Sequence, residues 1–196
     1  MARMLDVLDR IRDLEVELER DIAAAQEQWH YKVETGRVRF EQEVHRRHKQ
    51  LKTSVRRYLQ ESYLPSILTA PVIYSVILPF LALDLWASLY QRICFPIYGI
   101  ARVCRSDYIV FDRRKLAYLN GIEKANCDYC GYANGLLAYI REISARTEQY
   151  WCPIKHSRRI KGPHPHYRGF VDYGDAEGYK RELPVLRKVL NDDREA

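Results

Sequence analysis

Residues 64 to 100 read LPSILTAPVIYSVILPFLALDLWASLYQRICFPIYGI, and none of the residues from Leu64 to Leu83 carries a charge. About 20 uncharged, mostly apolar residues match the length of a helix that crosses the hydrocarbon core of a bilayer, and buried helices of soluble domains are usually shorter. The run lies far from the N-terminus, unlike a cleaved signal peptide. We therefore expect a membrane segment here.

The interior of this run favours a hairpin. Four prolines punctuate it: Pro65, Pro71, Pro79 and Pro96. Each removes a helical donor and bends the chain, so one straight span is not expected. Asp84 divides the run and reads as the polar turn of a hairpin, with an ion or proton site as the alternative. Arg92 at mid-bilayer would cost about 2.5 to 3.5 kcal/mol, which places it near headgroups instead. We expect a re-entrant or monotopic hairpin over residues 64–104; a single span and a helix buried in a soluble core or by a partner are the alternatives.

Basic residues flank the apolar run on both sides. Those that follow it are Arg102, Arg105, Arg113, Arg114 and Lys115. Those that precede it, which we expect to contact anionic lipid headgroups, are Arg46, Arg47, Lys49, Lys52, Arg56 and Arg57. Cytoplasmic flanks collect Lys and Arg, so both termini are expected in the cytoplasm. Each basic residue near an anionic leaflet contributes about 1 kcal/mol, although a solvated helix face is the simpler alternative. Nucleic acid is not an expected partner despite the net charge of +6, because no binding motif accompanies the charge.

Residues 1–63 are predicted to form one long amphipathic helix. Residues 4 to 63 contain no proline, and apolar side chains recur at close to the helical period. Such a helix would extend roughly 90 Å, which is too long to bury its apolar stripe within so small a chain. We therefore expect a coiled coil with a second copy, giving a homo-oligomer, or with a partner helix. Gly36 is the point at which the helix could fold back as a helical hairpin instead.

Residues 105–161 are predicted to form a small helical domain. Asp112 is a candidate N-cap for a helix over 113–124, and a second helix is expected over 132–149. Residues 108–111 before them would be a short strand or an extended connector.

Cysteines and one histidine in this domain have the spacing of a metal site. Cys127 and Cys130 are two residues apart and precede Gly131, as in a zinc knuckle, while Cys152 and His156 follow the second predicted helix. Together they form a set suited to a tetrahedral structural zinc site. Iron, an iron–sulfur cluster, a redox-active dithiol and unliganded cysteines are the alternatives. A disulfide is disfavoured because the expected compartment is reducing.

The tail, residues 162–196, contains a second pair of candidates. His164 and His166 could bind a metal or act as general bases, but two loop histidines are more often surface residues. Asp175 is expected to cap a short helix, and Pro184 to begin another. No phosphate-binding glycine loop, nucleophile elbow or metalloprotease motif is present in the sequence, so enzymatic activity is left open.

Several motifs of the last two thirds of the chain together resemble a known family. They are TAPVIY from Thr69, CFPIYG from Cys94, SDYIVFD from Ser106, YLN from Tyr118, EKANCDYC from Glu123, RTEQYWCPIKH from Arg146 and DYGDAEGY from Asp172. They are similar to a family of uncharacterised bacterial, largely proteobacterial, membrane-associated proteins. The resemblance implies a bacterial source, and hence the inner membrane, but it assigns no activity and no site residue.

The sequence thus predicts a mainly α protein that joins a long helix, a proline-bent membrane hairpin and a metal-stapled helical domain. The expected role is that of an oligomeric scaffold or adaptor at the membrane. The alternative is a membrane-bound metal- or thiol-dependent redox enzyme that acts on a lipid-soluble substrate.

Overall fold

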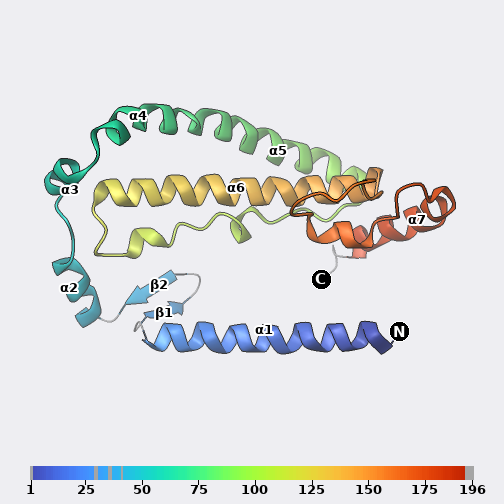
Figure 1. Ribbon diagram of the computed structural model, residues 1–196, viewed down its shortest axis with the longest axis horizontal. Coiled ribbons are helices and arrows are strands. Elements are labelled where there is room, and N and C mark those ends of the chain that lie inside the picture. Colours follow the sequence, from blue (N-terminus) through green and yellow to red (C-terminus); the bar gives the residue numbers. More distant parts are fainter. Residues whose placement is uncertain (1, 29–30, 35–36, 41, 193–196) are drawn as a thin grey trace. The chain divides into compact units, whose positions relative to one another are not determined.

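The computed structural model describes residues 2–28, 31–34, 37–40 and 42–192, and the chain is mainly helical as predicted (Figure 1). It divides into two compact units. The first comprises residues 1–61 and 112–125, and the second comprises residues 62–111 and 126–196.

The first unit corrects the prediction of a single helix over residues 4–63. Its elements are α1 (Ala2–Gln28), β1 (Tyr31–Glu34), β2 (Arg37–Phe40), α2 (Gln42–Gln50) and α3 (Val55–Glu61). The two strands pair antiparallel, with Tyr31 opposite Phe40 and Glu34 opposite Arg37. Apolar residues at every second position of this segment favour strands. Some of the same residues also fit the 3.6-residue period of a helix, so the sequence alone did not reveal the strands. The fold-back expected at Gly36 lies outside the described residues.

The apolar run forms two consecutive helices, α4 (Leu64–Ser75) and α5 (Ile77–Tyr98), which continue in one direction along a curved path (Figure 1). The turn predicted at Asp84 is wrong, because Asp84 lies inside α5. Pro65 and Pro79 do not reverse the chain because each lies in the first turn of its helix, where no backbone donor is needed. The chain turns back only at Gly99, which has a φ of 70°.

A single helix, α6 (Gly121–Trp151), replaces the two helices predicted over 113–124 and 132–149. Asp112 makes no cap hydrogen bond, and only a short 3-10 turn, η2 (Arg113–Lys115), follows it. The N-cap is Asn120, whose side-chain oxygen accepts hydrogen bonds from the amides of Ile122 (2.9 Å) and Glu123 (3.0 Å). Glu123 in turn accepts from the Asn120 amide at 2.8 Å, which completes a capping box. In the first unit, the Tyr118 ring packs edge-on against His48 of α2 at 5.2 Å.

The second unit packs α5, α6 and the segment between them around one core. Its most deeply buried apolar side chains are Phe95, Ile100, Leu136, Tyr139 and Leu190. Residues 100–111 return from the end of α5 and include the short 3-10 turn η1 (Arg105–Asp107); residues 108–111 contain no strand, so the extended connector is confirmed. This segment lies so close to α6 that a Cβ on Gly135 would collide with the Tyr108 carbonyl oxygen.

The chain ends with η3 (Pro165–Gly169) and α7 (Ala176–Asp192). Asp175 caps α7 as predicted, because its carboxylate accepts a hydrogen bond from the Gly178 amide at 2.8 Å. Pro184 does not begin a separate helix; it lies within α7.

Candidate membrane-contact surface and the polar network beneath it

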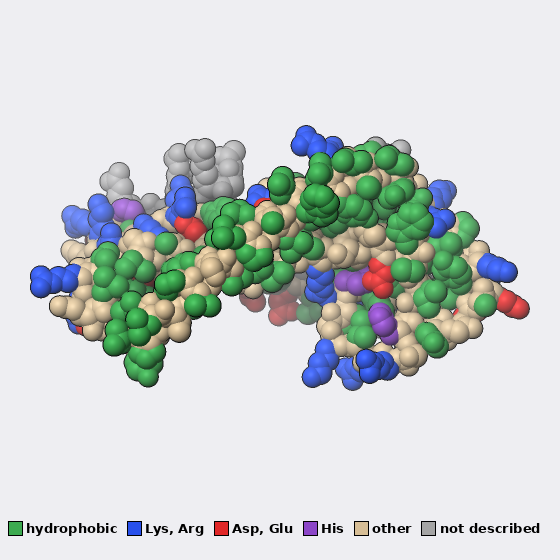
Figure 2. Space-filling model, turned by 90° about the horizontal axis from the view of Figure 1, so that it is seen from above, with side chains coloured by type: hydrophobic (Ala, Val, Ile, Leu, Met, Phe, Trp, Pro, Cys, Tyr) green, Lys and Arg blue, Asp and Glu red, His purple; other side chains and the backbone are tan. Residues whose placement is uncertain are grey.

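The outer face of α4 and α5 is an exposed apolar surface. Together the two helices are long and apolar enough to cross a membrane, and no residue of their most apolar stretch is buried. Six large side chains each expose between 67 and 73% of their surface: Leu68, Val72, Leu78, Leu85, Trp86 and Ile97. Figure 2 shows hydrophobic side chains gathered along this face. Soluble monomers rarely leave so extended an apolar patch uncovered, so the patch is a candidate surface for contact with lipid or another apolar partner.

The inner face of α5 carries the polar residues of the same helix. Asp84 forms a bidentate ion pair with Arg105, whose Nε and Nη2 donate at 3.1 and 2.7 Å. The hydroxyl of Tyr132 on α6 donates to the same carboxylate at 3.0 Å. The Asp84 side chain is only 13% exposed, so these donors replace the water that the charge loses. Asp84 therefore fastens α5 to α6 and to the returning segment.

A second group of polar side chains, one and two helical turns after Asp84, also links α5 to α6 and to residues 100–111. Gln91 accepts a hydrogen bond from the Val103 amide at 3.0 Å and donates to Tyr139, and Ser88 lies 3.3 Å from the Tyr139 hydroxyl. Gln91 and Tyr139 are almost fully buried. Buried polar groups hold a packing arrangement in register when all their partners are present. Asp84, Ser88 and Gln91 of α5 thus face inward, whereas Arg92 on the same helix is exposed.

The tail histidines pair with carboxylates of α6. His166 lies 3.0 Å from Glu142, and His164 lies 2.9 Å from Glu148. Arg146 donates to Glu142 at 2.8 Å. The hydrogen bond from His166, together with Arg146, lowers the pKa of Glu142 to about 2, even though burial acts in the opposite direction. The sequence near His164 and His166 contains no carboxylate pattern that indicates these pairs. Their partners, Glu148 and Glu142, lie on α6, 16 and 24 positions earlier in the chain.

The structure does not bring the four predicted zinc ligands together. Cys127 and Cys130 lie on α6 one helical turn apart, and Cys152 comes directly after the end of that helix. Cys152 follows Cys130 by 22 positions, which correspond to about 33 Å along a helix. Within the described ranges, no group of three or more His, Cys, Asp or Glu side chains is placed to hold a metal ion.

The segment Cys127–Gly131, predicted to form a knuckle, is part of α6. Two cysteines three positions apart fit one face of a helix as well as they fit a turn, so the spacing alone did not distinguish the two. The backbone amide of His156 donates to the Tyr167 hydroxyl at 2.7 Å, and the two rings stack with centroids 5.9 Å apart. Zinc held by all four residues, or a redox centre built from them, would require α6 to break. A metal-stapled domain is therefore not confirmed among the described residues.

The predicted headgroup ligands lie on α2 and α3 and between these helices, and all of their side chains are exposed: Arg46, Arg47, Lys49, Lys52, Arg56 and Arg57. Arg47 pairs with Glu43 at 3.2 Å and Arg57 with Glu61 at 2.7 Å, both as exposed pairs one turn apart. Exposed pairs of this kind contribute little to stability, so these cations remain accessible to an anionic surface.

Comparison with known proteins adds no assignment. No protein-family model matches the chain, and no curated protein and no solved structure shows significant similarity to it.

Proposed function

We propose that this protein is a monotopic scaffold or adaptor of the bacterial inner membrane, with the outer face of α4 and α5 embedded in one leaflet. The observation that carries the proposal is the division of α5 into two faces. Leu85 and Trp86 point outward and are highly exposed, whereas Asp84 and Gln91 point inward and are satisfied by hydrogen bonds. Burial of each large apolar side chain in lipid contributes about 1.5 to 3 kcal/mol, so a row of them anchors a protein without a crossing.

The neighbours of α5 favour an in-plane over a crossing orientation. The 35 residues from Leu64 to Tyr98 extend about 52 Å, well beyond a hydrocarbon core of about 30 Å. Residues 100–111 and α6 accompany α5 along its length (Figure 1). A crossing would carry irregular backbone and the charged groups of Arg141, Glu142 and Arg146 into the membrane, where neither is tolerated in contact with lipid. In the plane of the interface, all of them stay on the water side.

The first unit supplies the features of an adaptor. On α1, Leu14, Leu18 and Ile22 follow one another at intervals of four residues, and all three are exposed. An apolar stripe of this kind accepts a second helix, which we assign to another copy of the chain or to a partner protein. The basic residues of α2 and α3 precede the membrane helices directly, and we assign them to anionic headgroups on the cytoplasmic side.

Flotation with lipid vesicles tests the proposal. The double change Leu85→Glu/Leu89→Glu places two charges on the outer face of α5 and is expected to abolish flotation of the full chain. The matched control is Val185→Glu/Val189→Glu on α7, which alters two exposed apolar residues with the same spacing. The proposal predicts that the control floats like the unchanged protein. Equal flotation of all three proteins, or of none, contradicts it.

A further inference from the structure

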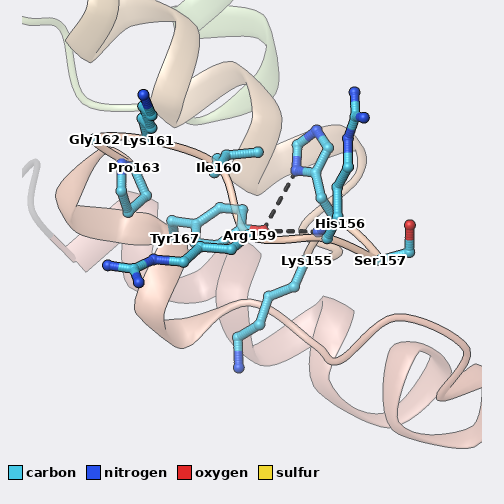
Figure 3. Close-up of a pocket in the computed structure, with 10 residues that line it drawn as sticks. Lys155, His156, Ser157, Arg159, Ile160, Lys161, Gly162, Pro163 and Tyr167 are labelled. Atoms are coloured by element: carbon cyan, nitrogen blue, oxygen red, sulfur yellow. Dashed lines mark hydrogen bonds between the residues drawn. The ribbon is translucent and has the colours of Figure 1, made fainter.

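The loop after α6 lines an open cavity with many basic side chains. Residues 155–163 and Tyr167 surround a volume of about 800 Å³ (Figure 3). Half of the ten lining residues have basic side chains, and none has a carboxylate: the basic ones are Lys155, His156, Arg158, Arg159 and Lys161. Cavities of this size hold small organic ligands, and this lining selects for negative charge.

Three of these basic residues have no hydrogen-bond or ion-pair partner among the residues that the structure describes. Lys155 pairs with Asp172 at 2.7 Å, but Arg158, Arg159 and Lys161 make no hydrogen bond or ion pair within the part of the chain that the structure describes. Figure 3 shows the side chains of Lys155 and Lys161 extending from the loop in opposite directions. The backbone amides of residues 157–162 likewise donate to no acceptor among the described residues.

The floor of the cavity is held in place. Tyr167 accepts a hydrogen bond from the His156 amide at 2.7 Å and stacks on its ring. Arg141 of α6 donates to the Gly162 carbonyl at 2.7 Å, which fastens the far end of the loop. The Lys155 amide donates to the Val171 carbonyl at 2.8 Å at its near end. The loop is therefore anchored at both ends, which lowers the entropic cost of ordering it around a ligand.

We propose that this cavity binds a phosphate-bearing ligand. Guanidinium groups, ammonium groups and free backbone amides are the donors that phosphate oxygens accept from, and no carboxylate lines the cavity to repel them. The phosphate belongs either to a lipid headgroup or to a soluble phosphorylated compound. The site does not depend on the membrane placement of α4 and α5, because the cavity is formed entirely by residues that follow α6.

Titration of the full-length protein with pyrophosphate, in neutral detergent, tests the site. The change Arg158→Gln/Arg159→Gln removes two charges without breaking a hydrogen bond or ion pair among the described residues, and it is expected to weaken binding by about tenfold or more. The control Lys180→Gln/Lys188→Gln removes the same charge from exposed positions of α7 and should leave the affinity unchanged. Thermal melting of both variants checks that the fold is intact.

A vesicle arm distinguishes the two sources of phosphate. Phosphatidylcholine vesicles with and without phosphatidic acid are compared for the same three proteins. A preference for phosphatidic acid that is weaker only in Arg158→Gln/Arg159→Gln assigns a lipid headgroup, and pyrophosphate binding with an unchanged preference assigns a soluble ligand. The proposal is overturned if the loop variant and the α7 control behave alike in both arms. The membrane proposal is tested separately: it fails if the unchanged protein does not bind vesicles of phosphatidylcholine alone.

Discussion

The ion pair between Asp84 and Arg105 gives the sharpest prediction about how the second unit is held together. The change Arg105→Met keeps most of the side-chain volume but removes both donors to the Asp84 carboxylate. The Tyr132 hydroxyl, at 3.0 Å, and the Ser88 hydroxyl, at 3.4 Å, then remain as donors to a side chain that is 13% exposed. The charge is left with two hydroxyl donors in place of the guanidinium, in a largely dry position.

The expected loss of stability follows from the exposure of the two partners. Breaking a fully buried ion pair by removing one member costs about 3 to 5 kcal/mol, and an exposed pair contributes about 1 kcal/mol or less. Arg105 is 45% exposed, so water can reach the Asp84 carboxylate once the guanidinium is gone. We therefore expect a loss of about 2 kcal/mol, or a decrease in melting temperature of about 4 to 8 °C.

The assay is thermal unfolding in detergent, followed by circular dichroism, for a double-mutant cycle with Asp84→Asn. Asparagine removes the charge, so the second change should cost much less once the first is present, with a coupling of about 1 kcal/mol or more. Additive losses, or an Arg105→Met protein as stable as the unchanged chain, would refute the structural role of the pair.

Three further predictions concern α6 and its contacts. Asn120→Ala removes the N-cap of α6 and should reduce stability by about 1 kcal/mol in urea unfolding, whereas Asn120→Asp should retain most of it. Gly135→Ala places a methyl group against the Tyr108 carbonyl and should cost about 1 to 3 kcal/mol in the same assay; Gly169→Ala, where a Cβ meets nothing, is the control. The pKa of Glu142 is lowered from 4.5 to about 2, so its stabilising contribution is complete above about pH 4.5 and is lost as the pH falls towards 2. Melting temperatures measured between pH 5 and 2 should therefore decrease less steeply for Glu142→Gln, and parallel curves would count against this assignment.

The apolar helices were predictable because their signal depends on composition alone. A run without charge from Leu64 to Leu83 indicates a membrane-length helix, whatever surrounds it. The role of Asp84 was not predictable from the same run. A charged residue between apolar halves reads as a turn, and its partner Arg105 lies 21 positions further along the chain.

The failure of the knuckle prediction also has a local cause. Cys127 and Cys130 fit a knuckle or a helix equally well, so their spacing could not decide between the two. The capping box formed by Asn120 and Glu123 was the missed signal, because it starts a helix at Gly121 that has no proline before Trp151. The pairing of His166 with Glu142 is a tertiary contact that no local pattern indicates.

The two strands of the first unit could not be predicted, because their apolar residues fit the spacing of a helix as well as that of a strand. Val33 and Phe40 fit both an apolar stripe on a helix and alternation along paired strands. The strands of this hairpin are short, so cross-strand pairing decides the outcome where local propensity does not.

The placement of α5 in lipid is tested most directly by the fluorescence of Trp86, which is 72% exposed on the outer face. In a protein with Trp29→Phe and Trp151→Phe, Trp86 is the only tryptophan, and vesicles of brominated phosphatidylcholine report its contact with acyl chains. An in-plane helix predicts strong quenching by bromine near the headgroups, weaker quenching by bromine at the bilayer centre, and protection from iodide in the water. Full access to iodide without quenching by any brominated lipid would contradict the membrane-contact surface.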